Sequence, residues 1–197
     1  MKEYPILFNG AMVRAILKGP KEVTRRLDVD RWLKLRKGDR LWVRETWTVF
    51  EVHDASVGLG YRADHPLGGD LSKTDGGYSF TYLENPEHLK QARLRVSCDR
   101  WRPAIHMYRW ASRILLELTE DPRAERLQDI TEEDAIAEGV QPWQFNEQQT
   151  MTSGELGCVQ PFRGGFACEW DDINERADRT WFANPEVAVV RFRRKAA

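Results

Sequence analysis

Short strand-like segments separated by turn sequences are the feature that most constrains the fold of this chain. These segments alternate apolar and polar residues or are rich in β-branched and aromatic types, as is typical of short β-strands. They do not follow the strand–helix–strand rhythm of a doubly wound sheet. The pattern predicts an α+β fold, a mixed or closed β-barrel of about five to seven strands with helices packed outside. The strand-like segments are residues 5–8, 23–27, 40–47, 58–63, 93–97, 111–119, 123–127 and 187–192.

The stretch from Lys18 to Arg26 joins a predicted helix to a predicted strand. Residues 10–18 place apolar side chains at helical spacing, and Asn9 can cap their first turn. Gly19 and Pro20 end this helix, because glycine accepts the left-handed cap conformation and proline cannot continue a helix. The junction carries two lysines, two arginines and a threonine, so it can present cations and a hydroxyl together at the mouth of a site.

Two further helices are predicted in the second half of the chain. Thr131 is a strong N-cap followed by acidic residues, and this helix ends near Gly139. Residues 166–177 place apolar side chains at helical spacing. The polar, glycine-rich stretches near residues 64–90 and 141–165 are expected to be inserted loops or a small hairpin within one domain formed by all 197 residues.

The net charge of −1 conceals an uneven distribution of charged residues. Residues 14–44 carry eleven Lys/Arg against four Asp/Glu, and residues 93–113 carry six against one. Residues 117–138 reverse this balance, with two Lys/Arg against nine Asp/Glu. Cations gathered on one face would favour binding of phosphates. The alternative is that surfaces of opposite sign lie side by side in the fold.

Glu45 is a carboxylate on the apolar face of the predicted strand 40–47. A buried carboxylate needs a partner, because an isolated charge is strongly disfavoured in an apolar environment. We expect an arginine from a neighbouring strand to pair with Glu45, which would make it a structural residue.

Residues 101–110 are irregular and interleave aromatic with basic side chains. This composition suits stacking on bases and contact with phosphates, and the candidate binding residues are Trp101, Arg102, His106 and Arg109. The alternative is that the tryptophans pack in the barrel while the arginines pair with the acidic segment that follows. We expect a structural role for Trp110.

Several classes of protein are disfavoured by the sequence. Three cysteines without short paired spacing argue against a disulfide framework or a zinc ribbon, and the four histidines lack metal-ligand spacing. We therefore expect no metal and no cofactor. No signal peptide and no membrane-spanning apolar stretch is recognisable, so a cytoplasmic protein without a membrane partner is expected. Nothing in the sequence indicates an oligomeric state.

The pattern G-x-K-x-x-T-x-R that begins at Gly19 resembles the signature of the ASCH domain, a branch of the PUA-like β-barrel superfamily. The order of elements agrees, with a helix before the signature, a Gly-Asp turn into a strand, a late acidic helix and a final strand. The likeness covers over half of the chain and extends to ASCH-like proteins carried by phages and prophages. It implies a PUA-like barrel that binds RNA or other nucleic acid, in the host cytoplasm if the protein is encoded by a phage.

A small bacterial subset of the ASCH family hydrolyses the amide of N4-acetylcytidine with a lysine, a threonine and a glutamate. By this resemblance the catalytic candidates are Lys21, Thr24 and Glu138. Arg25 and Arg26, which flank Thr24 in the basic junction, are candidate substrate contacts. Amide hydrolysis needs a nucleophile, a base and a proton donor for the leaving amine. Thr24 can serve as nucleophile with a neutral Lys21 as its base, or Lys21 and Glu138 can activate a water. The sequence leaves both mechanisms open.

The leading hypothesis is a cleft that binds a modified pyrimidine nucleoside or nucleotide, with hydrolysis of an N4-acylated cytosine as the candidate reaction. The cleft is expected to be bounded by the Lys18–Arg26 junction, the acidic helix and residues 101–110. Two other functions suit the same residues. One is a non-catalytic RNA- or DNA-binding module, or a nuclease, and the other is a phage adaptor whose inserted loops bind a host protein.

Overall fold

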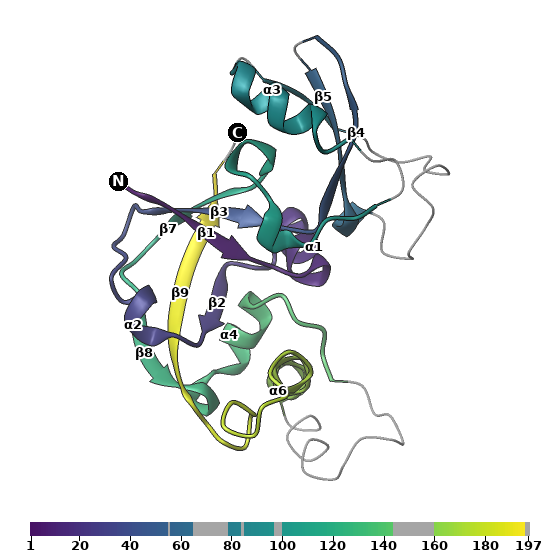
Figure 1. The fold of residues 1–197 in the computed structure, drawn as a ribbon. Helices are drawn as coiled ribbons and strands as arrows, with labels where there is room; N and C mark the ends of the chain where they lie inside the picture. The colour runs from purple at the N-terminus through teal and green to yellow at the C-terminus, as the bar shows by residue number, and fades with distance from the viewer. Residues whose placement is uncertain (55, 65–78, 84, 97–99, 144–159, 196–197) are drawn as a thin grey trace. The chain divides into compact units, whose positions relative to one another are not determined.

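The computed structural model describes residues 1–54, 56–64, 79–83, 85–96, 100–143 and 160–195 (Figure 1). These residues form a mixed α+β fold with two sheets, which confirms the predicted α+β class. The chain divides into two compact units, which are described separately. The first comprises Met1–Lys2, Ala15–Arg40 and Glu117–Arg194, and the second comprises Glu3–Arg14, Leu41–Leu116 and Lys195–Ala197.

The larger sheet is curled and contains six strands in the hydrogen-bonding order β1-β3-β7-β9-β2, with β8 also paired to β9. Strand β9 pairs antiparallel with β2, placing Val23 opposite Arg191, and antiparallel with β8, placing Arg123 opposite Val189. The predicted segment 123–127 therefore pairs with β9. The strands are β1 (Glu3–Leu7), β2 (Val23–Arg26), β3 (Arg40–Arg44), β7 (Leu115–Leu118), β8 (Arg123–Arg126) and β9 (Glu186–Arg194).

The helix ends follow the local signals in the sequence. Helix α1 (Gly10–Lys18) is capped by Asn9, whose Oδ1 accepts a hydrogen bond from the Met12 amide at 2.9 Å. It is followed by Gly19 in the left-handed region, at a φ of 104°. Helix α4 (Glu132–Ala137) is capped by Thr131, which accepts from the Asp134 amide at 3.1 Å. The predicted bounds of α1 and the predicted caps are confirmed.

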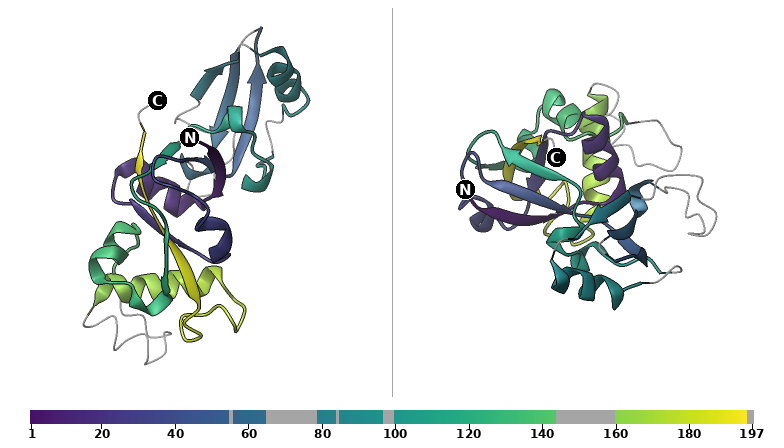
Figure 2. Two further views of the ribbon diagram at one scale, coloured as in Figure 1. Left: turned by 90° about the vertical axis from the view of Figure 1, so that its left-hand side faces the viewer. Right: turned by 90° about the horizontal axis from the view of Figure 1, so that it is seen from above.

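The helices of the first unit pack around one apolar cluster. Helix α6 (Pro161–Ile173) places Phe166 and Trp170 four residues apart on one face, where both are buried with Trp181 and Val187. The same cluster also contains Leu127, Ile130 and Ala135, from the segment before α4 and from α4 itself. Figure 2 shows α6 beside α4 in both views. The unit also contains α2 (Val29–Trp32) and a 3₁₀ turn, η5 (Leu127–Asp129).

The second unit contains a three-stranded antiparallel sheet with a helix against it (Figure 1). Its apolar cluster gathers Trp47, Val49, Leu59 and Tyr61 from the sheet with Ala92 from the helix. The same cluster takes in Met107 and Ala111 from the irregular segment that follows the helix. The elements are β4 (Trp47–Val52), β5 (Ser56–Tyr61), η1 (Arg62–Asp64), β6 (Ser79–Tyr82), α3 (Pro86–Arg93), η3 (Ala104–His106) and η4 (Arg109–Ala111).

Three sequence predictions of secondary structure are wrong or misplaced. The predicted strand 40–47 is two strands, because the chain leaves β3 after Arg44 and starts β4 at Trp47. Residues 93–97 were expected to be a strand, but Arg93 is the last residue of α3. This helix starts with an Asn85 cap, which accepts from the Glu87 amide at 2.9 Å, and with Pro86 at its first position. The third predicted helix begins at Pro161, within the stretch expected to be an inserted loop.

The two predicted insertions lie partly outside the described residues. Strand β6 falls within the first insertion and pairs antiparallel with β5, as expected for a small hairpin. Residues 65–78 and 144–159 are not described. No helix among the described residues is long and apolar enough to cross a membrane.

Candidate functional site

Lys21 and Glu138 form a buried ion pair in the first unit, although they are separated by 117 positions in the chain. Lys21 Nζ donates to Glu138 Oε2 at 2.6 Å, to the Glu138 backbone oxygen at 2.8 Å and to the Val23 backbone oxygen at 3.1 Å. The two residues are only 4% and 5% exposed. The lysine and glutamate proposed from the ASCH resemblance are therefore brought into direct contact.

The backbone around these two residues explains their approach. The Glu22 amide donates to the Ala137 backbone oxygen at 2.8 Å, which joins the chain before β2 to the end of α4. Gly139 follows with a φ of 77°, and a Cβ atom at this position would lie 3.1 Å from the Lys21 Cβ and 2.7 Å from the Ala15 Cβ. A glycine is needed here for the left-handed backbone and for the close approach of α4 to Lys21.

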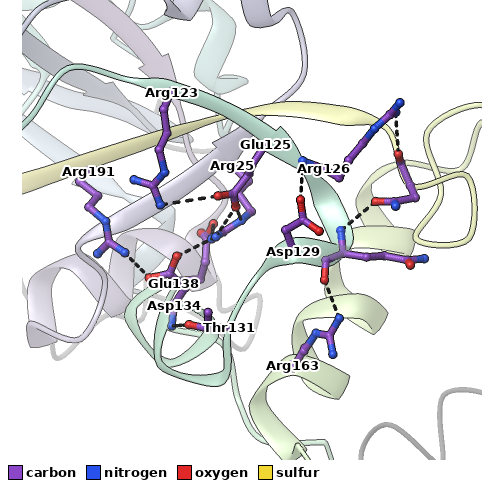
Figure 3. A network of polar contacts seen from close by, with 12 residues as sticks. Arg25, Arg123, Glu125, Arg126, Asp129, Thr131, Asp134, Glu138, Arg163 and Arg191 are labelled. Carbon is purple, nitrogen blue, oxygen red and sulfur yellow. Dashed lines mark hydrogen bonds and ion pairs between the residues drawn. The ribbon is translucent and has the colours of Figure 1, made fainter.

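Arg25 extends this pair into a network of charged groups (Figure 3). Its guanidinium lies 3.4 Å from Glu138 Oε1, 2.8 Å from Asp134 Oδ2 and 2.6 Å from Glu125 Oε1. Asp134 also accepts a hydrogen bond from Arg191 of β9. Arg25 therefore links one carboxylate of β8 with two carboxylates that lie four residues apart on and beside α4.

Burial and charge act in opposite directions on these groups. Burial lowers the pKa of Lys21 below its ordinary value, against the influence of Glu138. Burial also lowers the pKa of Arg26 to about 10. Burial acts in the same direction on Arg25, but Glu138, Asp134 and Glu125 together raise its pKa. In return, Arg25 and Arg191 outweigh the effect of burial on Asp134 and lower its pKa. Burial thus favours the neutral form of Lys21, whereas the surrounding carboxylates favour the charged form of Arg25.

Thr24 and Arg26 occupy the opposite face of β2 from Arg25, because side chains alternate along a strand. The Thr24 residue is 2% exposed, and its hydroxyl makes no hydrogen bond within the part of the chain that the structure describes. Lys21 and Glu138 are therefore brought into contact, whereas Thr24 bonds to neither, and its hydroxyl keeps a donor and an acceptor for a ligand. Arg26 is partly exposed at the end of β2.

The four candidates from residues 101–110 lie in the second unit. Arg102 and His106 line one pocket, whereas Trp101 and Arg109 are not among its lining residues. Trp101 is partly buried, with the Arg62 guanidinium 5.5 Å from its ring centroid. Arg109 is exposed, and its Nε donates to Glu3 Oε2 at 2.8 Å. The cleft shared between these residues and the Lys18–Arg26 junction stays a prediction.

Two structural expectations in the second unit are confirmed. Glu45 is 2% exposed and pairs with Arg113, which donates to its two carboxylate oxygens at 2.9 and 3.0 Å. The partner is an arginine, as expected, but it lies two residues before β7, the neighbour of β3 in the sheet, and not within a strand. Trp110 packs edge-on against Trp47 at a centroid distance of 5.7 Å and donates to Gln91, which gives it a structural role.

Sequence reasoning missed three members of the charged network: Asp134, Glu125 and Arg191. Asp134 could have been found, since it lies four residues before Glu138 and therefore on the same helical face. Nothing local in the sequence marks Glu125 or Arg191, because their positions follow from the pairing of β8 and β2 with β9.

The arrangement in the first unit combines a buried ion pair, a hydroxyl that makes no hydrogen bond among the described residues, and cations held by carboxylates. The described residues contain no group of three His, Cys, Asp or Glu side chains that could hold a metal ion. Comparison with protein-family models, curated proteins and solved structures found no match to this chain. The chemistry therefore has to be argued from these contacts and from the resemblance of the G-x-K-x-x-T-x-R pattern.

Proposed function

We propose that this protein binds a modified pyrimidine nucleoside or nucleotide and hydrolyses the amide of an N4-acylated cytosine at the Lys21–Glu138 pair. The observation that carries the proposal is the 2.6 Å contact between Lys21 Nζ and Glu138 Oε2 in a buried setting. Groups that exchange protons during catalysis need pKa values shifted toward neutrality, and burial shifts the pKa of Lys21 in that direction.

The proposed reaction starts with a proton transfer from the Lys21 ammonium to the Glu138 carboxylate. Burial favours this step, because it converts two buried charges into two neutral groups. The freed lysine lone pair then accepts the proton of the nucleophile as the nucleophile attacks the acyl carbon. The bond between that carbon and the exocyclic nitrogen breaks, and the nitrogen takes a proton from the Glu138 carboxyl. The products are the free cytosine amine and a carboxylic acid, with water consumed overall.

The nucleophile is either the Thr24 hydroxyl or a water molecule. The Thr24 hydroxyl is the candidate for the first choice, since it makes no hydrogen bond within the described residues and a nucleophile must be free to approach the substrate. In that case a Thr24 ester forms and a water molecule hydrolyses it. The Arg26 guanidinium stays protonated at neutral pH and would stabilise the developing oxyanion.

The test is turnover of N4-acetylcytidine, followed by chromatography of released cytidine. We expect the wild type to release cytidine and Lys21→Met, Thr24→Val and Glu138→Gln each to lower the rate at least about 100-fold, as for general acid–base groups. The matched control is Glu133→Gln, which removes an exposed carboxylate of the same helix and should turn over like the wild type. Intact-protein mass spectrometry would detect an acetyl group on Thr24 if its hydroxyl is the nucleophile.

Two results would contradict this proposal. One is a folded wild type that leaves N4-acetylcytidine unchanged, and the other is a Lys21→Met variant that retains full activity. Thr24→Val is the most informative variant, because valine has nearly the same shape as threonine and lacks only the hydroxyl. If it unfolds with the same midpoint as the wild type but loses turnover, a purely structural role for Thr24 is excluded.

A further inference from the structure

The second unit contains a basic pocket that the proposed reaction does not use. It has a volume of about 410 Å³, within the range of small-molecule sites. Half-buried arginines, exposed residues and a buried methionine contribute to its lining. The lining residues are Arg44, Arg95, Arg102, Ile105, His106, Met107 and Tyr108.

The three guanidinium groups of this pocket lack the usual counter-charges. Within the described residues no carboxylate pairs with Arg44, Arg95 or Arg102, in contrast with the paired arginines Arg25 and Arg113. Lining a single pocket with three unneutralised cations is unfavourable unless an anion joins them. This charge arrangement selects an anionic ligand.

Neutral groups hold each of these arginines in place and leave it spare donors. Arg44 Nε and Nη2 donate to the Met107 backbone oxygen at 3.3 and 3.2 Å, and Arg102 Nη2 donates to the Arg95 backbone oxygen at 2.9 Å. Arg95 donates to the Gln91 backbone oxygen and to the Tyr108 hydroxyl. Since a guanidinium has five N–H donors, every one of the three keeps at least two for a ligand.

Arg102 carries the most specific sign of a missing partner. Its Nε is buried and has no hydrogen-bond partner among the described residues. Leaving a buried charged donor unsatisfied is costly, so buried polar atoms nearly always have partners. A ligand oxygen in the pocket would supply this charge-assisted bond, and the Nη1 group of Arg102, which donates to no described residue, can bond a second oxygen on the other edge of the guanidinium.

The aromatic lining does not offer an open stacking surface. One contact of the Tyr108 ring is with the Arg95 guanidinium, 4.6 Å from its centroid, and another is the stacked Trp110 ring at 5.8 Å. These contacts already occupy part of the Tyr108 ring. The anionic group of the ligand is what the pocket can recognise.

We propose that this pocket is a phosphate-binding site, which takes the phosphate groups of a free nucleotide or the backbone phosphates of a single-stranded nucleic acid. Both sources present the same phosphate oxygens, and the pocket recognises the charge and geometry of these oxygens without contacting the base. This site is independent of the Lys21–Glu138 pair, so binding at Arg102 and turnover at Lys21 can fail separately.

The experiment measures affinity by calorimetry with pyrophosphate, cytidine 5′-monophosphate, cytidine and a short single-stranded oligonucleotide. We expect pyrophosphate to bind, and cytidine 5′-monophosphate to bind more tightly than cytidine, which lacks the phosphate. For the oligonucleotide, three phosphate contacts predict a slope of about −2 in a plot of log affinity against log salt concentration. A tighter complex with the oligonucleotide than with the monophosphate identifies nucleic acid as the ligand, and the reverse order identifies a free nucleotide.

Variants of the pocket arginines separate specific binding from general electrostatic attraction. Arg102→Gln should weaken binding by about tenfold or more and reduce the salt slope by about 0.7, whereas Arg102→Lys should keep the slope and lose affinity. The control is Arg93→Gln, which removes an exposed cation of α3 that does not line the pocket. If Arg102→Gln fails to fold, Arg44→Gln makes the same test.

Three outcomes would overturn the proposal. The first is that no phosphate-bearing probe binds to the folded wild type. The second is that Arg102→Gln and Arg44→Gln bind as tightly as the wild type. The third is that a polyglutamate peptide binds as tightly as the oligonucleotide at the same ionic strength, which would make the pocket a site for carboxylates.

Discussion

Replacing Glu138 by glutamine should expose how strongly the buried charges of the first unit depend on one another. The variant keeps the size of the side chain but leaves the Lys21 ammonium, 4% exposed, without its charged partner at 2.6 Å. Breaking a buried ion pair on one side typically costs about 3–5 kcal/mol. Lys21 can escape this penalty only by losing its proton, which costs about 5 kcal/mol at pH 7 for a lysine of ordinary pKa. We expect Glu138→Gln to lower the free energy of unfolding by about 3–5 kcal/mol at pH 7.

The loss should depend on pH in a defined direction. Burial already lowers the pKa of Lys21 in the folded protein, so the unfolded chain binds more protons between the two pKa values. Stability then rises with pH over that window, and the lysine penalty disappears above the unfolded pKa. Removing Glu138 lowers the folded pKa further and widens the window. At pH 10 the difference between Glu138→Gln and the wild type should shrink to about 1 kcal/mol, the value of a lost hydrogen bond.

Urea unfolding followed by tryptophan fluorescence measures both quantities at pH 7 and pH 10. The matched control is Glu133→Gln, an exposed carboxylate of the same helix, which should change stability by less than about 1 kcal/mol. The double variant Lys21→Met, Glu138→Gln should be more stable at pH 7 than Glu138→Gln alone, because it removes the unpaired charge. An equal loss at both pH values, or a double variant no more stable than Glu138→Gln, would refute this account of the pair.

Two further changes test other parts of the fold. Gly139→Ala should destabilise the protein by about 1–3 kcal/mol more than Gly38→Ala, as measured by urea unfolding of both variants. Both glycines have a positive φ, but of the two only Gly139 has other atoms within contact distance of an added Cβ. Arg113→Met should lower the free energy of unfolding by about 3–5 kcal/mol at pH 7, since it leaves the buried Glu45 carboxylate unpaired. Burial raises the pKa of Glu45, so the loss of stability should become smaller toward pH 4, where the carboxyl takes up a proton. The control is Arg176→Met, at an exposed ion pair, which should change stability by less than about 1 kcal/mol at either pH.

Helices and strands were predictable from the sequence where one short-range feature, such as a capping residue, fixes where the element begins or ends. The ends of α1 and the start of α4 follow from Asn9, Gly19 and Thr131, because a cap needs only a side chain and the backbone of the next turn. Strands β2 and β9 were found from their β-branched and alternating residues. The α+β class follows from these elements alone.

Other elements were misjudged where two local signals compete. Residues 93–97 contain an alternation that suits a strand, but the Asn85 cap and Pro86 begin a helix whose last residue is Arg93. The predicted strand 40–47 is divided between two sheets, since β3 ends at Arg44 and β4 begins at Trp47, and the continuous alternation of residue types does not mark this break.

The candidate site was predictable only in part. The Lys21 and Glu138 candidates came from a resemblance, and the structure brings these two side chains into contact. The basic and aromatic composition of residues 101–110 pointed to phosphates, but Arg44 and Arg95 of the pocket lie outside that segment. Composition could not tell Arg102, which faces the pocket, from Arg109, which pairs with Glu3.

By itself the sequence determined the helix caps, most of the strands and the residue types that could do chemistry, because these depend on neighbours within a few positions. The tertiary structure decided which charges meet. Lys21 reaches Glu138 across 117 positions because the chain before β2 bonds to the end of α4 and Gly139 admits the close approach. Arg25, Asp134 and Arg191 meet through the register of β2 on β9. Strand register and helix packing depend on the whole apolar core, so no local sequence pattern predicts these contacts between charged side chains.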